Sequence, residues 1–246
     1  MGRVDGKVAI ISGGARGMGA SHARLLVAEG AKVVIGDILD DEGKALVDEL
    51  GDAARYVHLD VAQADQWQEA VGIAVGEFGK LNVLVNNAGI ANGSSIQAFK
   101  HDKWQKIIDV NLTGTFYGIQ ASTDPMIAAG GGSIINVSSI EGLRGAPWAH
   151  GYVATKWAVR GLAKSVALEL APHNIRVNSL HPGLIRTPMT EKFPDDLVTI
   201  PLGRPGNSSV VSTFVLFLAS DESSYATGTE FVVDGGLVTD VPHKSM

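Results

Sequence analysis

Short apolar runs rich in β-branched residues alternate with amphipathic stretches along most of the chain. These runs occupy residues 7–12, 32–37, 55–59, 81–85, 133–139, 174–180 and 230–233. Their length and composition predict buried strands, and the helical patterns between them predict right-handed parallel crossovers. The pattern therefore predicts an α/β fold, and a chain of 246 residues can form it as a single domain, residues 1–246.

Two stretches depart from a simple strand-and-helix alternation. The helix expected from residue 152 to about 171 is apolar around most of its circumference, which favours burial on more than one side and hence a subunit interface. Residues 188–205 contain several prolines and glycines together with Met189 and Phe193. We interpret this segment as a mobile lid able to close over a ligand.

Composition and charge exclude several classes of function. A net charge of −6 argues against a nucleic-acid partner. The absence of cysteine excludes disulfides, thiolate nucleophiles and cysteine-bound zinc. The seven histidines form no metal-ligand pattern, so no metal is expected, and His150 and His181 are expected to pack or form hydrogen bonds. Without a signal-peptide core or a long apolar run, a cytoplasmic protein with no membrane partner is expected.

A glycine-rich turn follows the first strand. Gly13, Gly17 and Gly19 connect that strand to a helical stretch, the context in which backbone amides and a helix N-terminus bind phosphate. The spacing differs from the usual dinucleotide fingerprint, and a turn that binds nothing is the alternative.

The second strand ends on an acidic residue, Asp37. A carboxylate there accepts hydrogen bonds from adenosine ribose hydroxyls and repels a 2′-phosphate, which favours NAD over NADP. Arg16 argues the other way, but Ile38 supplies no second cation. Asp60, after the third strand, is either an adenine contact or a helix N-cap, and the sequence does not decide between them.

Tyr152 and Lys156 are one helical turn apart, so an ammonium group is expected beside a phenol. Because a free tyrosine has a pKa near ~10, a nearby positive charge can bring the phenol toward working pH as a general acid/base. Ser139 ends the fifth strand and can hydrogen-bond the same substrate oxygen. Asn111, inside a helix, is unfavourable unless its amide has a specific partner. A chance surface pair is the alternative for Tyr152 and Lys156.

Taken together, these motifs resemble the short-chain dehydrogenase/reductase family over essentially the whole chain. The resemblance is carried by Gly13, Gly17 and Gly19; Asp37; Asp60-Val61; Asn86-Asn87-Ala88-Gly89; Asn111; Ser139; Tyr152 with Lys156; Pro182-Gly183 with Thr187; and Asp234-Gly235-Gly236. It implies a Rossmann-type, doubly wound sheet of seven parallel strands with helices on both faces, usually assembled as a homotetramer.

The resemblance also implies a role for each catalytic residue. Tyr152 would be the acid/base, and Lys156 would lower its pKa and hold the nicotinamide ribose. Ser139 would polarise the substrate oxygen, Asn111 would hold a water that relays protons to Lys156, and Thr187 would bind the carboxamide. The implied cofactor-binding residues are Ser12, Gly13, Arg16, Gly17, Met18, Gly19, Asp37, Asp60, Val61, Asn87, Ala88, Gly89, Tyr152, Lys156, Pro182, Gly183, Ile185 and Thr187.

Within the family, the sequence is most similar to bacterial 3α(or 20β)-hydroxysteroid dehydrogenases, mainly in stretches 12–19, 37–40, 52–60 and 221–225. Large apolar side chains near the expected site suit a bulky hydrophobic alcohol or ketone, with ordinary core packing as the alternative. The candidate substrate residues are Ser139, Glu141, Leu143, Arg144, Trp148, Met189 and Phe193.

The leading hypothesis is therefore an NAD-dependent oxidoreductase that interconverts secondary alcohols and ketones, with a hydroxysteroid as substrate. The competing hypotheses are a 3-oxoacyl-carrier-protein reductase, a small cyclic alcohol dehydrogenase, and an NAD-sensing binding protein without turnover.

Overall fold

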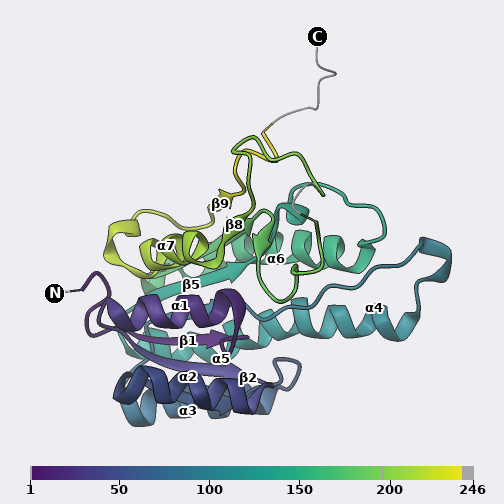
Figure 1. Ribbon diagram of the computed structural model, residues 1–246. Helices are drawn as coiled ribbons and strands as arrows, with labels where there is room; N and C mark the ends of the chain where they lie inside the picture. The colour runs from purple at the N-terminus through teal and green to yellow at the C-terminus, as the bar shows by residue number, and fades with distance from the viewer. Residues whose placement is uncertain (1, 195–196, 240–246) are drawn as a thin grey trace.

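Seven parallel strands form one sheet in the order β3-β2-β1-β4-β5-β6-β9 (Figure 1). The computed structural model describes residues 2–194 and 197–239. The strands are β1 (Val8–Ser12), β2 (Lys32–Asp37), β3 (Ala54–His58), β4 (Val83–Asn86), β5 (Gly132–Val137), β6 (Ile175–Pro182) and β9 (Glu230–Val233). The seven-stranded α/β fold expected from the sequence is confirmed. The strand order changes direction between β1 and β4, and ligands bind at such a switch point in doubly wound sheets.

Helices cover both faces of the sheet. One layer contains α1 (Gly17–Ala28), α2 (Asp40–Leu50) and α7 (Ser208–Ala219); the other contains α3 (Ala64–Phe78), α5 (Gly114–Ala128) and α6 (His150–Leu170). Within β1, Ala9 and Ile11 pack into the first layer, whereas Val8 and Ile10 pack into the second. Both faces are therefore buried, which explains why the strands read as continuous apolar runs.

Helix α4 (His101–Ile108) continues into α5 through a π-helical turn, η3 (Asp109–Thr113). Single π-turns inside α-helices often occur at functional sites, and this one carries Asn111. The remaining short elements are η1 (Gly51–Ala53), η2 (Ile96–Ala98), η4 (Ile140–Gly142), η5 (Ala171–His173), η6 (Asp221–Ser223), β7 (Ile185–Arg186) and β8 (Gly206–Asn207).

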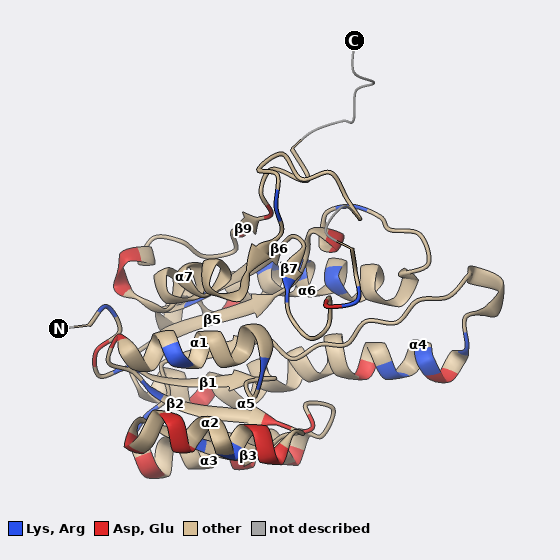
Figure 2. Ribbon diagram, viewed as in Figure 1, with Lys and Arg blue, Asp and Glu red and all other residues tan. Residues whose placement is uncertain are grey.

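Two surface features bear on the sequence expectations. Acidic side chains are frequent on α2 and α3 (Figure 2), and Asp40, Asp41 and Glu42 occupy the first turn of α2, where they complement the helix dipole. On α6, Leu168 and Trp157 remain 82% and 44% exposed. This exposure accords with the expected subunit interface, which stays a prediction.

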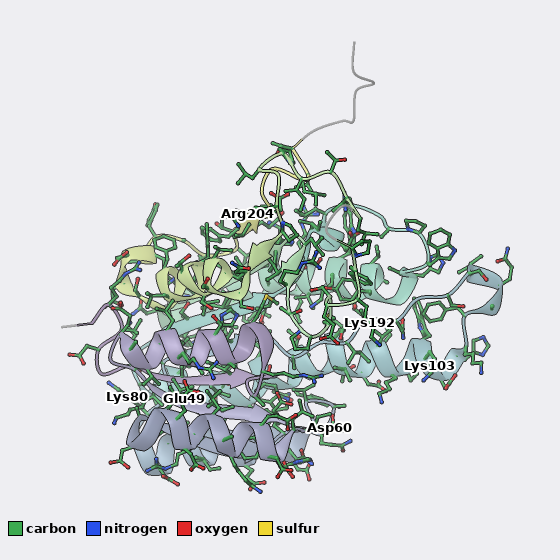
Figure 3. All side chains as sticks on the ribbon, in the orientation of Figure 1. Glu49, Asp60, Lys80, Lys103, Lys192 and Arg204 are labelled. Carbon is green, nitrogen blue, oxygen red and sulfur yellow. The ribbon has the colours of Figure 1, made fainter. Side chains whose placement is uncertain are left out.

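The segment 188–205 connects the short strands β7 and β8, which pair in parallel with each other. Lys192 and Arg204 belong to this segment (Figure 3). Met189 and Phe193 are each about half exposed. Residues 195–196 of this expected lid lie outside the described residues, and the mobility of the segment stays a prediction. Among the described residues, no helix is long and apolar enough to cross a membrane.

A buried histidine joins two helices of the first layer. His22 on α1 is fully buried, and its Nδ1 lies 2.8 Å from the Ser212 hydroxyl on α7. Its Nε2 has no hydrogen-bond partner among the described residues. Burial lowers the pKa of His22 from 6.5 to about 3, so the folded protein keeps this ring neutral.

We expect His22 to make folding stability depend on pH. The unfolded chain binds a proton below its histidine pKa of 6.5, whereas the folded state resists protonation until about pH 3. Stability should therefore fall by about 2 kcal/mol between pH 7 and pH 5 from this group alone. Urea unfolding at both pH values should show a smaller loss for His22→Gln than for wild type. An equal loss in the two proteins would contradict the assignment, and exposed His101→Gln is the control.

Candidate active site

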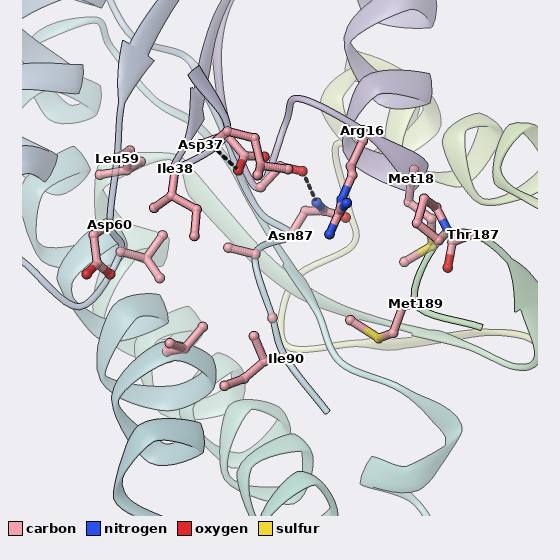
Figure 4. A pocket seen from close by; sticks show the side chains of 18 of the residues that line it. Arg16, Met18, Asp37, Ile38, Leu59, Asp60, Asn87, Ile90, Thr187 and Met189 are labelled. Atoms are coloured by element: carbon pink, nitrogen blue, oxygen red, sulfur yellow. Dashed lines mark hydrogen bonds between the residues drawn. The ribbon is translucent and has the colours of Figure 1, made fainter. Parts of the chain in front are cut away.

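A cavity of about 360 Å³ lies where the carboxyl ends of β1, β2, β3 and β4 meet. It is lined by Gly13, Arg16, Gly17, Met18, Asp37, Ile38, Leu39, Leu59, Asp60, Val61, Asn87, Ala88, Gly89, Ile90, Lys106, Val110, Thr187, Pro188 and Met189. Figure 4 shows Ile38, Leu59 and Asp60 toward one end, with Met18, Thr187 and Met189 toward the other. The cavity is therefore elongated across the switch point of the sheet.

The glycine loop forms one wall of this cavity and contacts the loop after β4. Gly13 has φ +62°, and a Cβ added to it would lie 2.8 Å from the Ala88 Cα. The buried Ser12 hydroxyl accepts hydrogen bonds from the backbone N–H groups of Asn87 and Ala88 at 3.1 and 3.2 Å. Glycine is required at position 13 because a side chain would separate the two loops.

Asp37 lies at the end of β2 and is nearly buried. Its Oδ2 accepts a hydrogen bond from the Ala15 N–H at 2.9 Å, and its Oδ1 accepts one from the Leu39 N–H at 3.2 Å. The carboxylate is thus held in one orientation against the glycine loop. Arg16 lines the same cavity (Figure 4), so the two opposite charges that bear on the choice between NAD and NADP both border the site.

Asp60 is not the N-cap of a helix. Helix α3 begins at Ala64 after the N-cap residue Gln63. The Asp60 Oδ1 instead accepts a hydrogen bond from the Ala62 N–H at 3.0 Å, within a local turn that borders the cavity. Of the two roles that the sequence left open, the structure excludes the helix cap.

Some expected cofactor residues lie outside the cavity lining. Gly19 makes a packing contact, since a Cβ there would lie 2.1 Å from the Gly13 carbonyl oxygen. Ile185 is buried in the core. The expected cofactor residues outside the lining are Ser12, Gly19, Tyr152, Lys156, Pro182, Gly183 and Ile185, and direct cofactor contacts stay predictions for these and for the lining residues alike. Met189, expected at the substrate, lines the same cavity as the cofactor candidates.

The four expected catalytic residues lie outside the lining of this cavity, but Asn111 and Lys156 adjoin it at Gly89. A Cβ at Gly89 would lie 3.5 Å from both the Asn111 Oδ1 and the Lys156 Nζ. The Lys156 Nζ lies 5.5 Å from the centroid of the Tyr152 ring, and the Ser139 hydroxyl is close enough to Tyr152 to lower the pKa of its phenol. The structure therefore brings together side chains from η3, the end of β5 and the first turns of α6.

The electrostatics of Tyr152 differ from the sequence expectation. Burial raises the pKa of Tyr152, the hydrogen bond from Ser139 lowers it, and the nearby Glu141 carboxylate raises it, with a net upward shift. Burial also lowers the pKa of Lys156 to about 8, and its Nζ donates to the Val137 carbonyl at 2.8 Å. For these groups alone the net effect on the Tyr152 pKa is therefore upward, because desolvation is the largest cause, and the expected lowering of this pKa by Lys156 stays a prediction.

The Asn111 amide does have specific partners. Its Oδ1 accepts from the Ile90 N–H at 2.8 Å, and its Nδ2 donates to the Ile90 carbonyl at 2.9 Å and to the Thr155 hydroxyl at 3.2 Å. Asn111 thereby fixes the chain after β4 against the catalytic helix α6. Its expected role in holding a water stays a prediction.

His181 contributes to the site through contacts that no sequence motif reveals. It is fully buried, with Nδ1 2.8 Å from the Ser139 carbonyl oxygen and Nε2 2.9 Å from the Ser179 hydroxyl. A carbonyl can only accept, so Nδ1 carries the proton and Nε2 accepts from Ser179. Burial lowers the pKa of His181, which keeps the ring neutral. The expected hydrogen-bonding role is confirmed, and it positions Ser139.

Lys106, Val110 and Ile90 were also missed as cavity-lining residues. They come from α4, η3 and the loop after β4, where no motif marks them. Among the described residues, no group of histidine and acidic side chains could hold a metal ion.

The loop between Ser139 and α6 carries several of the expected substrate residues. Glu141 forms an ion pair with Arg144 at 3.2 Å, and burial raises the pKa of its carboxyl group. Trp148 is 63% exposed and has φ +62°, which is strained for a side chain of this size. Its carbonyl accepts a hydrogen bond from the Ser94 N–H at 3.0 Å, which ties two loops together.

Comparisons with known proteins place this geometry among oxidoreductases. A family model described as "Enoyl-(Acyl carrier protein) reductase" matches residues 13–238. A 3-alpha-(or 20-beta)-hydroxysteroid dehydrogenase of Mycobacterium tuberculosis is 64% identical over 99% of this chain and 94% of its own length. A trans-4-hydroxycyclohexanecarboxylate dehydrogenase of Sinomonas cyclohexanicum is 51% identical over 95% and 93%, and a cyclopentanol dehydrogenase of Comamonas testosteroni is 45% identical over 96% and 98%.

We expect the strain at Trp148 to be measurable by substitution. Glycine adopts a positive φ without a steric penalty, whereas alanine does not, so Trp148→Gly should be more stable than Trp148→Ala by about 1 kcal/mol. The comparison isolates the backbone, because both variants lose the indole ring. Chemical denaturation of the two variants provides the measurement, and equal stability would show that the backbone at position 148 is unstrained.

Proposed function

The chain belongs to the short-chain dehydrogenase/reductase family and is an oxidoreductase acting on CH–OH groups, and we propose that it is an NAD-dependent hydroxysteroid dehydrogenase of the 3α/20β type. The observation that carries this proposal is the grouping of Ser139, Tyr152 and Lys156, with Lys156 next to Gly89 in the wall of a cavity that the glycine loop also lines.

The cavity fits a nicotinamide dinucleotide. The absence of side chains at Gly17 and Gly89 leaves space in the cavity wall and next to Lys156, and side chains there would fill the cradle. The apolar Ile38 and Val61 near Asp60 suit an adenine ring, and Thr187 lines the cavity toward its other end. When bound, the nicotinamide supplies the hydride acceptor for alcohol oxidation and the hydride donor for ketone reduction.

Asp37 supports NAD as the preferred cofactor. Its carboxylate is fixed by two backbone N–H groups at the end of β2 and presents negative charge where a 2′-phosphate would lie. Arg16 is the opposing charge at the same cavity. A carboxylate held rigidly in place discriminates against a second negative group more strongly than a mobile one.

Proton transfer is the task of Tyr152. During oxidation its phenolate accepts the proton of the substrate hydroxyl, and during reduction its hydroxyl returns a proton to the developing alkoxide. Ser139 hydrogen-bonds the same oxygen and holds it near the phenol. Lys156 is positioned to bind the nicotinamide ribose and to stabilise the phenolate. Asn111 would hold a water that passes protons to Lys156, as the family resemblance implies.

The substrate class rests on similarity and on apolar exposure. The relative with 64% identity is named as a hydroxysteroid dehydrogenase. Trp148, Met189 and Phe193 expose large apolar surface on the segments expected to flank the substrate. Such side chains bury the rings of a bulky alcohol or ketone. A small cyclic alcohol is the second candidate, because relatives named for cyclohexane and cyclopentane substrates are 51% and 45% identical.

Two further functions have less support. A 3-oxoacyl-carrier-protein reductase would be expected to prefer NADPH, and Asp37 disfavours its 2′-phosphate. An NAD-sensing protein without turnover has no need of the assembled Ser139, Tyr152 and Lys156.

The quaternary structure and the compartment also belong to the proposal. We propose a cytoplasmic homotetramer in which α6 lies at a subunit interface. The exposed Trp157 and Leu168 on this helix support that placement, because large apolar side chains on one helix are typical of a surface covered by another subunit.

We expect NADH formation from 3α- or 20β-hydroxysteroids with NAD, and much slower turnover with NADP. Initial rates for 3α-, 17β- and 20β-hydroxysteroids beside cyclopentanol and cyclohexanol provide the measurement. Tyr152→Phe should lower kcat by at least ~10²-fold, because the general acid/base is lost, and should leave NADH binding intact.

Turnover of the small alcohols alone would leave the catalytic residues assigned but reject the steroid substrate. A preference for NADP would reject the role of Asp37. Full activity of Tyr152→Phe would reject the mechanism.

Glu141 should control the pH dependence of alcohol oxidation. Its carboxylate raises the pKa of Tyr152, so Glu141→Gln should lower that pKa and move the rise of kcat/KM toward lower pH. At pH 7 we expect kcat/KM of Glu141→Gln, taken as a fraction of its value on the alkaline plateau, to exceed the wild-type fraction on the order of two- to fivefold. The pH profile of kcat/KM measures the shift. The surface variant Glu69→Gln should leave the profile unchanged, and a profile that moves to higher pH in Glu141→Gln would contradict the assignment.

A further inference from the structure

The side chains of Tyr56, Asp40 and His58 form a polar cluster at the turn between β2 and α2. The Tyr56 hydroxyl on β3 lies 2.6 Å from the Asp37 carbonyl oxygen and 2.6 Å from the Asp40 Oδ1. The single hydroxyl proton is therefore shared between an acceptor at the end of β2 and an acceptor in the first turn of α2. The His58 Nδ1 lies 2.7 Å from the same Asp40 oxygen and provides Asp40 with a second partner.

Hydrogen bonds from the β3 side fix the backbone of Asp37. Its carbonyl oxygen accepts from the Tyr56 hydroxyl and also from the Leu59 N–H at 2.9 Å, so two donors from the β3 side fix one carbonyl. Its carboxylate accepts hydrogen bonds from the Ala15 and Leu39 N–H groups. The main chain and the side chain of Asp37 are therefore fixed by separate sets of donors.

The packing of α2 against Tyr56 provides an independent indication that this arrangement is specific. A Cβ added at Gly43 would lie 2.1 and 2.2 Å from two atoms of the Tyr56 ring, Cε2 and Cδ2. Gly43 is buried within α2 with no positive φ, so glycine is needed there for space and not for backbone conformation. The missing side chain lets the ring lie against the helix, where its hydroxyl reaches both Asp37 and Asp40.

We propose that Tyr56 is a positioning residue for cofactor selection: by fixing the turn from β2 to α2, it holds the Asp37 carboxylate where a 2′-phosphate would lie. This inference rests on the proposed NAD preference. Tyr56 does not line the cavity. Tyr56 acts through the Asp37 backbone. Without the Tyr56 hydroxyl the turn could shift, and the Asp37 carboxylate would then move away from the position that a 2′-phosphate would occupy.

The test is the ratio of the dissociation constants for NADH and NADPH, measured from the fluorescence of the bound nicotinamide. In Tyr56→Phe the ring still packs against Gly43, but the hydroxyl is lost. We expect NADH binding to weaken by about fivefold to tenfold, the effect of removing one hydrogen bond, while NADPH binding stays the same or tightens. The ratio of the two dissociation constants, and with it the preference for NADH, should therefore narrow by at least about fivefold.

A second variant reaches the same turn by a different route. Gly43→Ala keeps the Tyr56 hydroxyl but displaces the ring. It should therefore also reduce the preference for NADH over NADPH. Tyr117→Phe is the matched control, because this partly buried tyrosine has no hydroxyl hydrogen bond among the described residues. The preference of Tyr117→Phe for NADH over NADPH should equal that of wild type.

The outcomes separate a positioning role from a structural one. Equal weakening of NADH and NADPH binding in Tyr56→Phe, or a lower melting temperature with an unchanged ratio, would overturn the inference. Equal binding of the two dinucleotides by the wild-type protein would overturn it together with the role of Asp37. Selective NADH binding without turnover of any alcohol or ketone would reject the proposed substrates and leave the role of Tyr56 supported.

Discussion

The site depends on one set of hydrogen bonds that joins the ends of β1 and β4. The Ser12 hydroxyl accepts from two N–H groups of the loop after β4, and the Asn87 side-chain amide donates to the Ser12 and Gly13 carbonyls at 3.0 and 2.9 Å. Two parallel strands whose connections run in opposite directions leave a gap at their carboxyl ends. These bonds satisfy the backbone of both loops at that gap and hold Gly13 against Ala88. The cavity forms above this contact.

The catalytic end of the cavity is governed by desolvation. Burial raises the pKa of Tyr152 and lowers the pKa of Lys156 to about 8, so both groups are pushed toward their neutral forms. A neutral phenol is ready to donate a proton to a ketone oxygen. Oxidation of an alcohol needs the phenolate, which additional positive charge would stabilise, and an oxidised nicotinamide carries such a charge. With a cofactor bound beside it, the proton affinity of Tyr152 would depend on the oxidation state of the nicotinamide, and the neighbouring Glu141 raises this affinity.

The sequence predicted the strands and their parallel arrangement, and it predicted that Tyr152 and Lys156 lie one helical turn apart, because these features depend on local patterns. Buried strands have continuous apolar runs, and Tyr152 and Lys156 are related by helical spacing. It could not predict that the pKa of Tyr152 is raised, since desolvation depends on how tightly distant segments pack. Lys106 was missed, and the partners of His181 were not foreseen, for the same reason: each residue reaches the site through contacts between elements far apart in the chain. Asp60 was left undecided because its role depends on where α3 begins.

The expected cofactor residues lie at strand ends, whereas the expected substrate residues lie in loops. Cofactor choice and substrate choice could therefore vary separately. On the cofactor side, Asp37 is fixed by backbone donors at strand ends, and strand ends are tied to the sheet. On the substrate side, Glu141 and Trp148 belong to the loop before α6, and Phe193 belongs to the segment after β7. No strand of the seven-stranded sheet includes these three residues. Changes in those loops alter the shape offered to the substrate without moving Ser139, which His181 fixes from the end of β6. Variation confined to such loops would let one sheet and one set of buried contacts carry different substrate pockets, which fits relatives named for steroid and for small cyclic substrates.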